Sequence, residues 1–309
     1  MAIVTSAKQQ VIRESGALEF WPADQGEADV GGLDLMKAWL KEREVGFSEE
    51  ARKSKVKPPR GVALIGIPGT GKSLSAKMLS GLWKWPLLRL DVGALFGSLL
   101  GESEQNMRKA IMLAGTVSPC ILWIDEMEKA FAGSSVGSLN AGASTRVFGT
   151  FLTWMQEHTA PVFVIATAND IEGLPPELMG RFDETFFLDL PSDPERREIF
   201  SIHLKRAGET FPDRKFQLDE LVEKSRGMVG REIERVVSAA QFRALADQNR
   251  EIEQADLLLA LSKVIPLSKS HADVIDKIRK WKTEGLASPA SSEPRQEPVK
   301  RGRALDLPQ

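Results

Sequence analysis

Residues 61–73 read GVALIGIPGTGKS, an apolar run that breaks into a glycine-rich loop ending in lysine and serine. This stretch fills every position of the pattern G-x-x-x-x-G-K-[ST], in which backbone N–H groups converge on phosphate oxygens. Gly66, Gly69 and Gly71 permit the backbone angles that such a loop requires. The stretch therefore predicts a strand, a phosphate-binding loop and a helix, in that order.

Residues of this loop suit different parts of a bound nucleotide. The Lys72 ammonium can reach the outer phosphates, and the Ser73 hydroxyl is placed to ligate Mg²⁺. A helix expected from Lys72 to about Trp83 directs the positive end of its dipole at the same anion. The residues expected to contact the nucleotide are Gly66, Ile67, Pro68, Gly69, Thr70, Gly71, Lys72, Ser73 and Leu74.

Composition sets limits on the class of protein. The 309 residues are 42% hydrophobic and 27% charged, which is enough to bury a core in two lobes. The net charge of -2 argues against nucleic acid as a partner. Cys120 is the only cysteine, which excludes an intrachain disulfide. No apolar run is long enough for a membrane span or a secretory signal, so we expect a soluble, cytoplasmic protein.

The pattern along the chain predicts an α/β domain followed by an all-helical one. Residues 1–28 form a polar N-terminal arm. Within 29–191, short β-rich runs alternate with helical periods, which is typical of a parallel sheet covered by helices on both faces. We expect five parallel strands, at residues 62–66, 87–90, 120–124, 162–166 and 186–190.

The second half of the chain changes character. Residues 192–268 hold amphipathic helical stretches near 193–206, 217–225, 230–247 and 254–263 with no strand between them. A further C-terminal helix is expected within 269–284. Residues 285–309 are rich in proline, serine and charge, so we expect a disordered tail there.

Polar residues follow two of the expected strands. Asp125 and Glu126 follow the strand at 120–124, whose carboxyl end borders the ligand crevice of an open α/β sheet. Asp125 suits holding Mg²⁺ through its water shell, and Glu126 suits polarising the attacking water. Asn169, after the next strand, can hydrogen-bond the γ-phosphate and the water without adding charge. The alternatives are a solvated acidic turn and an ordinary Asn-Asp turn.

Taken in this order, GIPGTGKS, ILWIDE, TAND and the GRFD of residues 180–183 resemble the AAA subgroup of AAA+ ATPases over about residues 28–265. The resemblance implies an ATP- and Mg²⁺-binding domain with a helical lid, usually in a hexameric ring with ATP at each subunit interface. Val30 and Gly31 match the segment against the adenine. Arg181 matches an arginine finger that reaches the neighbour's γ-phosphate, and its alternative is a surface arginine in a turn.

A narrower resemblance extends from about residue 8 to 284. ALEFW near the start, DVGALFG and GESE within 91–104, and the late VIPLSKSHADVI resemble the AAA proteins encoded as a hypothetical open reading frame in algal chloroplasts and cyanobacteria. This resemblance implies that the chain corresponds to their ATPase module without their N-terminal domain.

Several positions depart from the AAA pattern. The extra arginine that usually precedes GRFD by two or three residues is absent. Arg231 stands where the subgroup usually has a small residue. It is a candidate sensor of the γ-phosphate from within the same subunit, or else an exposed arginine paired with Glu232 or Glu234. His203 matches a family position near adenine, although a surface histidine is the simpler expectation.

Two segments match the loops that line the central pore of such rings. Leu99 and Leu100 lie where threading members usually have an aromatic residue, and residues 133–143 are rich in glycine and serine. Core packing and an ordinary linker are the alternatives. We expect a homo-hexameric ATPase that remodels or organises an unknown protein client. The alternative is an ATP-controlled assembly scaffold or switch, which the missing arginine and the leucine residues favour.

Overall fold

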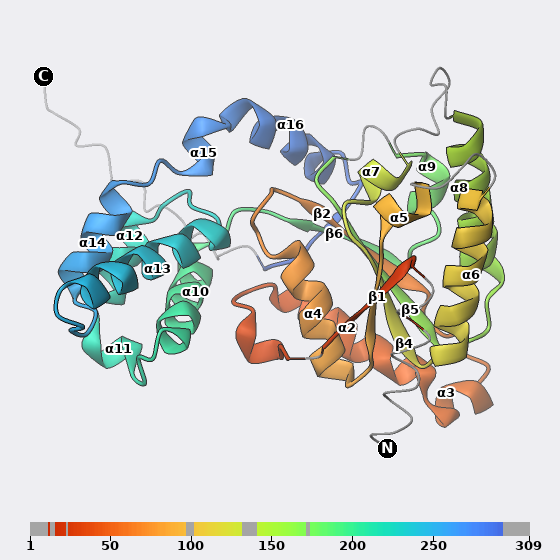
Figure 1. Cartoon of the computed structure of the whole chain (residues 1–309), viewed down its shortest axis with the longest axis horizontal. Coiled ribbons are helices and arrows are strands. Elements are labelled where there is room, and N and C mark those ends of the chain that lie inside the picture. Colours follow the sequence, from red (N-terminus) through yellow and green to blue (C-terminus); the bar gives the residue numbers. More distant parts are fainter. Residues whose placement is uncertain are drawn as a thin grey trace, which may run out of the picture.

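Within the residues that the structure describes, which are 12, 16–22, 24–96, 102–131, 141–170 and 174–292, seven strands form one sheet in the order β1-β3-β4-β5-β2-β6-β7 (Figure 1). These coordinates are a computed structural model. The strands are β1 (Leu18–Trp21), β2 (Gly61–Gly66), β3 (Leu87–Leu90), β4 (Cys120–Ile124), β5 (Val162–Ala168), β6 (Glu184–Leu188) and β7 (Ser288–Pro289).

The prediction of a five-stranded parallel sheet is confirmed for the central strands, and two edge strands are added to it. β3, β4, β5, β2 and β6 pair in parallel, as the alternation of strand and helix requires. β1 comes from the polar arm and pairs antiparallel with β3, whereas β7 pairs in parallel with β6. Both added strands are short and lie at an edge, so they lack the continuous apolar run of a buried strand.

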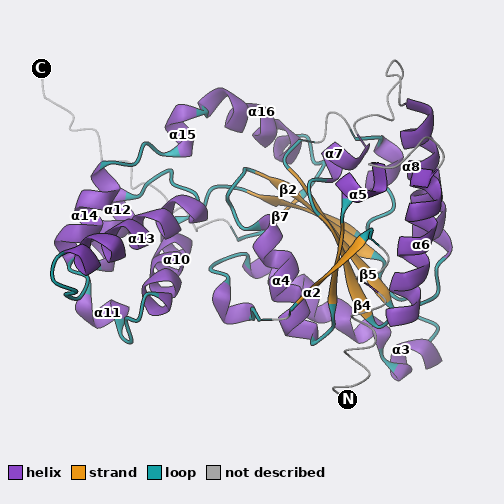
Figure 2. Ribbon diagram, in the orientation of Figure 1, coloured by secondary structure: helices purple, strands orange, loops and turns teal. Residues whose placement is uncertain are grey.

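Helices cover both faces of the sheet (Figure 2). α2 (Asp34–Glu44) and α4 (Lys72–Trp83) share one apolar cluster with one face, and α6 (Glu102–Val117) and α8 (Ala141–Glu157) share another with the opposite face. Every residue of β2, β4 and β5 is buried because both faces are covered. Short helical segments complete this lobe: α3 (Glu49–Lys53), α5 (Val92–Phe96), α7 (Met127–Phe131), α9 (Pro176–Met179) and the 3-10 turns η1 (Glu27–Asp29) and η2 (Val45–Phe47).

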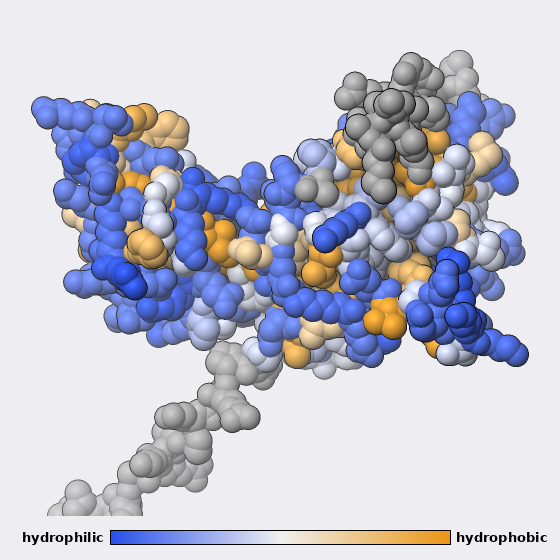
Figure 3. Space-filling model, turned by 90° about the horizontal axis from the view of Figure 1, so that it is seen from below, coloured by the Kyte–Doolittle hydropathy of each residue, from blue (hydrophilic) through white to orange (hydrophobic). Residues whose placement is uncertain are grey.

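A helical lobe follows β6, as the amphipathic stretches predict. It contains α10 (Asp193–Arg206), α11 (Pro212–Lys215), α12 (Leu218–Lys224), α13 (Gly230–Ala246) and α14 (Gln254–Ser262). Its own core is built around Phe200, Leu221, Val236 and Leu257, each of which is fully buried. The molecule is hollowed between the two lobes, and most of the surface facing the viewer in Figure 3 is hydrophilic.

The chain then returns from the helical lobe to the sheet. α15 (Leu267–Ser270) is followed by α16 (Ala272–Thr283), which bridges the two lobes in Figure 1. Ile278 and Trp281 of α16 join the core of the α/β lobe, and Arg279 pairs with Asp189 at 2.8 Å. Within the predicted disordered tail, residues 285–292 are instead ordered and include β7, while 293–309 lie outside the described residues. The carboxyl end of β6 is held by this return, because the backbone of Ala290 donates to the Phe187 carbonyl.

The expected pore-loop residues Leu99 and Leu100 lie outside the described residues, as do positions 133–140 of the glycine- and serine-rich stretch. Across the described part of the chain, no helix combines the length and the apolar character that a membrane span requires.

Candidate nucleotide-binding site

The phosphate loop lies between β2 and α4, as the sequence predicts. Gly66 ends β2 at φ 148°, and a Cβ atom there would lie 2.2 Å from the Leu188 carbonyl oxygen, so only glycine allows β6 to approach this closely. α4 begins directly after Gly71, and no side chain caps its N-terminus. The first-turn N–H groups of α4 therefore remain available to an anion.

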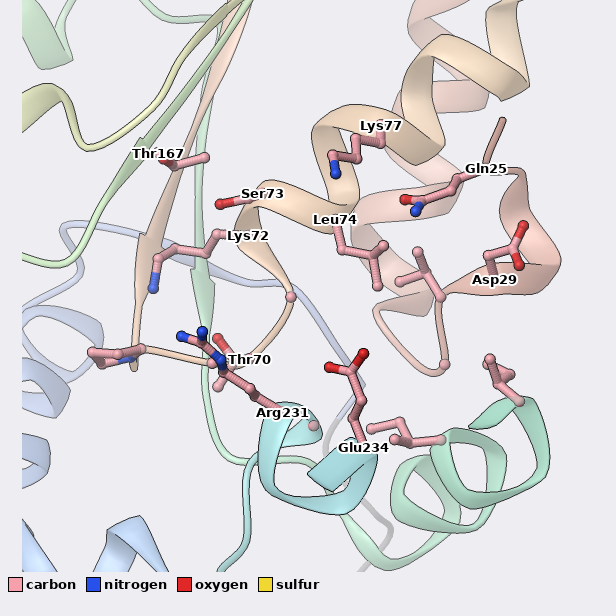
Figure 4. A pocket seen from close by; sticks show the side chains of 18 of the residues that line it. Gln25, Asp29, Thr70, Lys72, Ser73, Leu74, Lys77, Thr167, Arg231 and Glu234 are labelled. Atoms are coloured by element: carbon pink, nitrogen blue, oxygen red, sulfur yellow. The ribbon is translucent and has the colours of Figure 1, made fainter. Parts of the chain in front are cut away.

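Lys72 is buried within this loop. Its ammonium donates to the carbonyl oxygens of Gly66 at 2.7 Å and Ile67 at 2.9 Å. Burial lowers the pKa of Lys72 to about 8, although the carboxylates of Glu128, Asp125 and Glu126 oppose that shift. The lysine is thus held inside the loop by carbonyl groups, and its side chain points from the start of α4 toward the end of β2 in Figure 4.

Two strand ends and the first turn of α4 bring three oxygen-bearing side chains together. Ser73 Oγ donates to Asp125 Oδ1 at 3.1 Å, and Thr167 Oγ1 donates to the same oxygen at 2.7 Å. Thr167 also accepts a hydrogen bond from the Glu126 backbone N–H at 3.1 Å. β4 and β5 are adjacent, so Asp125 and Thr167 meet at the carboxyl ends of neighbouring strands. Thr167 was not among the site residues expected from the sequence, although it lies in the TAND motif.

This group of oxygens suits a magnesium ion. Mg²⁺ prefers oxygen ligands, retains several waters and uses one or two carboxylates, and here a single carboxylate lies beside two hydroxyl groups. Among the described residues, no cluster of three or more His, Cys, Asp or Glu side chains suggests a different metal. The donor set therefore fits the ion that was expected at Ser73 and Asp125.

Glu126 and Asn169 reach the same region from either side. The Glu126 carboxylate pairs with Lys129 at 2.7 Å, and its backbone has a left-handed φ of 51°, which is uncommon for glutamate. Asn169 donates from its backbone N–H and its side-chain Nδ2 to Glu128, at 3.2 and 3.3 Å. Burial raises the pKa of the Glu128 carboxyl, which was not among the site residues expected from the sequence.

A cavity of about 590 Å³ joins the phosphate loop to the helical lobe. This volume is within the usual range for a small-molecule site. Its lining contains most of the predicted residues and adds several from the arm and the lobe. The lining residues are Gln25, Asp29, Val30, Gly31, Pro68, Gly69, Thr70, Gly71, Lys72, Ser73, Leu74, Lys77, Asp125, Glu126, Thr167, Asn169, Ile199, Ile202, His203, Arg206, Gly230, Arg231 and Glu234.

The segment with Val30 and Gly31 forms one wall of this cavity because α10 holds it there. A Cβ atom on Gly31 would lie 2.9 Å from Ile199 of α10. The next backbone N–H, on Gly32, donates to Glu198 at 2.7 Å, and Asp29 pairs with Arg206 at 2.9 Å.

His203 lies one turn after Ile199, on the face of α10 that packs against the Val30 and Gly31 segment. It therefore lines the cavity wall, whereas a position on the outer surface was the simpler expectation. Burial lowers the pKa of His203 below its ordinary value. Ile199, Ile202 and Arg206 of α10 also line the cavity and were not expected from the sequence, because they lie over 160 residues away from Val30 along the chain.

Arg231 extends from α13 toward the phosphate loop in Figure 4. Its backbone N–H donates to the Gly69 carbonyl at 3.2 Å, so this end of α13 contacts the loop directly. Glu232 caps α13 through the Val229 N–H and also accepts from the Leu267 N–H. Among the described residues, no ion pair joins Arg231 to Glu232 or Glu234, which disfavours the surface-pair alternative.

Arg181 does not join the cavity of its own chain. It precedes β6, whereas the phosphate loop follows the carboxyl end of the neighbouring strand β2. Because β2 and β6 are parallel, Arg181 lies beyond the amino ends of the strands and the phosphate loop lies beyond their carboxyl ends. The length of β6 alone separates them by roughly 13 Å, at about 3.3 Å per residue. The Nε atom of Arg181 is buried without a hydrogen-bond partner.

Comparison with known proteins agrees with this site. The family model described as "ATPase family associated with various cellular activities (AAA)" matches residues 62–190. The chain is 43% identical over 294 residues to the AAA domain-containing protein ycf46 of Pyropia yezoensis, and 44% identical over 296 residues to that of Trieres chinensis. Each alignment covers 94% of this chain and 59% of the relative.

A solved structure gives the same fold at lower identity. The AAA domain of FIGL-1 superposes with a TM-score of 0.68 and 21% identity, over 90% of this chain and 95% of that one. The match to the family model spans β2 to β6 with the phosphate loop and both polar strand ends, and the ycf46 relatives extend the similarity over the arm and the helical lobe. Residues 62–190 of the chain therefore form a domain of the AAA family of ATPases.

Proposed function

We propose that this chain binds ATP with Mg²⁺ in the cavity between the sheet and the helical lobe and hydrolyses its γ-phosphate bond. The hydrogen bond between Ser73 and Asp125 carries the proposal, because it joins the phosphate loop to the acidic strand end. Membership of the AAA family supports ATP as the nucleotide and hydrolysis as the reaction.

Each residue has a distinct task in this proposal. The uncapped N-terminus of α4 and the Lys72 ammonium bind the phosphates, and Val30 and Gly31 with the α10 wall hold the base. Ser73 and Asp125 hold Mg²⁺, which when bound offsets the negative charge of the phosphates. Glu126 orients the attacking water and accepts its proton, and Asn169 helps to position that water.

The proposed site is completed by a second copy of the chain. Arg181 lies at the amino ends of the strands, whereas the phosphate loop lies at their carboxyl ends. Its charge can therefore only assist a nucleotide held by a neighbouring subunit. A cation supplied in trans stabilises the charge that develops during phosphoryl transfer. We therefore propose a closed ring, as a hexamer, in which Arg181 of one subunit reaches the ATP of the next.

We propose that the ring uses this cycle to remodel or organise a protein client. An ATP-controlled assembly scaffold or switch is the second candidate, because the chain lacks the arginine that usually precedes GRFD. The two differ in how assembly and turnover relate. A remodeller hydrolyses ATP continuously and faster with its client, whereas a scaffold assembles with ATP and turns over slowly whatever is present.

The test compares the wild type with Lys72→Ala and Glu126→Gln. We expect Lys72→Ala to lose nucleotide binding, and Glu126→Gln to bind ATP with near-normal affinity while turnover falls by at least about a hundredfold. Glu157→Gln, an exposed substitution at the end of α8, is the control for charge loss. Wild-type protein without ATP binding, or Glu126→Gln with normal turnover, would contradict the proposal.

A further inference from the structure

An ion-pair network extends from the proposed magnesium ligand Asp125 to the edge strand β1, and the proposed function assigns no role to its other members. It is centred on Arg89, which lies in β3 opposite Glu19 of β1 on one side and Trp123 of β4 on the other. All three side chains share the face of the sheet that α4 covers, since Trp123 packs in the same cluster as α4. Glu19 belongs to the ALEFW stretch near the start of the chain.

The Arg89 guanidinium is shared between two carboxylates. One terminal nitrogen lies 3.4 Å from Glu19 Oε2, and the other lies 3.7 Å from Asp125 Oδ2. The same group stacks over the Trp123 ring at 5.4 Å, and its Nε atom is buried without a hydrogen-bond partner. Arg89 therefore contacts the oxygen of Asp125 that Ser73 and Thr167 leave free.

Strand β1 is fixed beside this arginine by aromatic packing. Trp21 meets Trp123 edge to face at 5.7 Å, and its indole N–H donates to Glu19 at 3.4 Å. The Lys77 ammonium, from the cavity-lining face of α4, lies 4.4 Å above the Trp21 ring. β1 is thus linked to two residues of the cavity lining. Glu19 is linked to Asp125 through Arg89, and Trp21 contacts Lys77 directly.

We propose that Arg89 is a positioning residue that acts on the magnesium site through Asp125, and that Glu19 of β1 sets how strongly it does so. Arg89 is a counter-ion with which Mg²⁺ must compete for the charge of Asp125. Glu19 pairs with the same guanidinium and so weakens the attraction between Arg89 and Asp125. Losing Glu19 leaves Asp125 as the main partner of Arg89, and losing Arg89 removes the competing cation. This inference rests on the proposed MgATP site.

The two losses therefore have opposite effects, which simple structural damage would not produce. We expect Glu19→Gln to raise the Mg²⁺ concentration at the binding midpoint about twofold to fivefold, the size of a partly exposed ion pair. Arg89→Met should lower that midpoint, and the double variant should match Arg89→Met alone. Methionine keeps the apolar stem that packs on Trp123.

The measurement is equilibrium binding of ADP with a fluorescent ribose label, titrated with Mg²⁺, so it does not depend on turnover. Glu251→Gln is the matched control, because Glu251 is an exposed carboxylate that pairs with Lys215 in the helical lobe. Shifts of the same sign in both single variants, no shift in either, or a Glu19→Gln effect that persists without Arg89 would overturn the inference.

Failure of this inference can be told apart from failure of the proposed function. If the wild type binds labelled ADP and the variants do not shift the midpoint as stated, only the role of Arg89 is refuted. If the wild type binds no labelled ADP at any Mg²⁺ concentration, both proposals are overturned. The circular dichroism spectrum of each variant is recorded beside the titration, and a changed spectrum in Glu19→Gln counts against the assigned role of that exposed side chain.

Discussion

Thr167 Oγ1 donates a hydrogen bond of 2.7 Å to Asp125 Oδ1, the same oxygen that accepts from Ser73. Thr167 is almost fully buried, and its hydroxyl also accepts the Glu126 backbone N–H. One hydroxyl thus fixes the proposed magnesium ligand and the proposed catalytic glutamate with respect to each other. The precision of the acidic strand end depends on a residue that carries no charge.

Replacing Thr167 by valine should therefore impair turnover more than binding. Valine keeps the shape but leaves the Glu126 N–H without its acceptor, so we expect kcat to fall about tenfold and stability to fall by about 1 kcal/mol. Affinity for ADP should stay within about twofold. Thr116→Val is the control, since Thr116 is an exposed residue of α6 whose hydroxyl donates to the Met112 carbonyl of the same helix, away from the cavity. A normal kcat in Thr167→Val would show that this hydroxyl does not orient Glu126.

The lowered pKa of Lys72 predicts how nucleotide affinity depends on pH. In the free protein this pKa is about 8, and phosphate should raise it toward the ordinary value, so binding takes up a proton between these pH values. Affinity should consequently fall as the pH rises above about 8. Calorimetry in buffers of different ionisation enthalpy measures the proton uptake directly. Lys72→Arg, which does not titrate in this range, should lose the dependence, and an unchanged pH profile in that variant would assign it to another group.

The lowered pKa of Lys72 has the opposite effect on the stability of the free protein, which should increase with pH where nucleotide affinity decreases. Between pH 8 and 10.5 the unfolded chain binds more protons at Lys72 than the folded chain does, so the free energy of unfolding rises with pH across that window. As the pH rises through this window, nucleotide affinity should therefore fall while the free energy of unfolding of the free protein increases. Chemical denaturation with and without ADP at several pH values separates the two effects.

Arg181→Ala tests the proposed contribution from a neighbouring subunit. We expect turnover to be lost while ATP affinity stays nearly unchanged, because Arg181 lies outside its own cavity. A mixture of Arg181→Ala and Glu126→Gln subunits should regain activity. In mixed rings, sites form between a subunit with an intact Glu126 and a neighbour with an intact Arg181. Co-assembled mixtures that stay inactive would refute a finger supplied in trans.

Arg231→Ala addresses the proposed sensor within the same subunit. If its guanidinium binds the γ-phosphate, ATP affinity should fall about tenfold while ADP affinity changes by less than about twofold. Arg235→Ala, one turn further along α13, is the matched control for loss of charge from an exposed helix position. Equal weakening of ATP and ADP would indicate that Arg231 only supports the position of the helical lobe.

Much of this architecture was predictable because buried parallel strands are continuous apolar runs. The stretch CILWI forms β4 at the predicted residues, and the helix expected from Lys72 to Trp83 has those bounds in the structure. The strand beside the phosphate loop ends where the glycine pattern begins. Local sequence alone determined these elements, since each depends on periodicity and on turn residues that are close neighbours in the chain.

The parts that were missed depend on contacts between distant segments. β1 has only four residues and becomes a strand because β3 offers a free edge, which no local pattern reports. Thr167 acquires its role from Asp125, 42 residues away. The placement of His203 in the cavity wall follows from the packing of α10 against Gly31. Side-chain partners of this kind are set by tertiary packing, not by propensity.

The short edge strand β7 also affects the solubility of the protein. A parallel sheet with bare edges offers unpaired N–H and C=O groups to any other chain, and such edges promote aggregation. Here β6 is covered by a two-residue strand that contains Pro289, which has no N–H to donate further. A chain cut after Thr283 would expose the β6 edge, so we expect it to self-associate irreversibly even where its nucleotide site is intact.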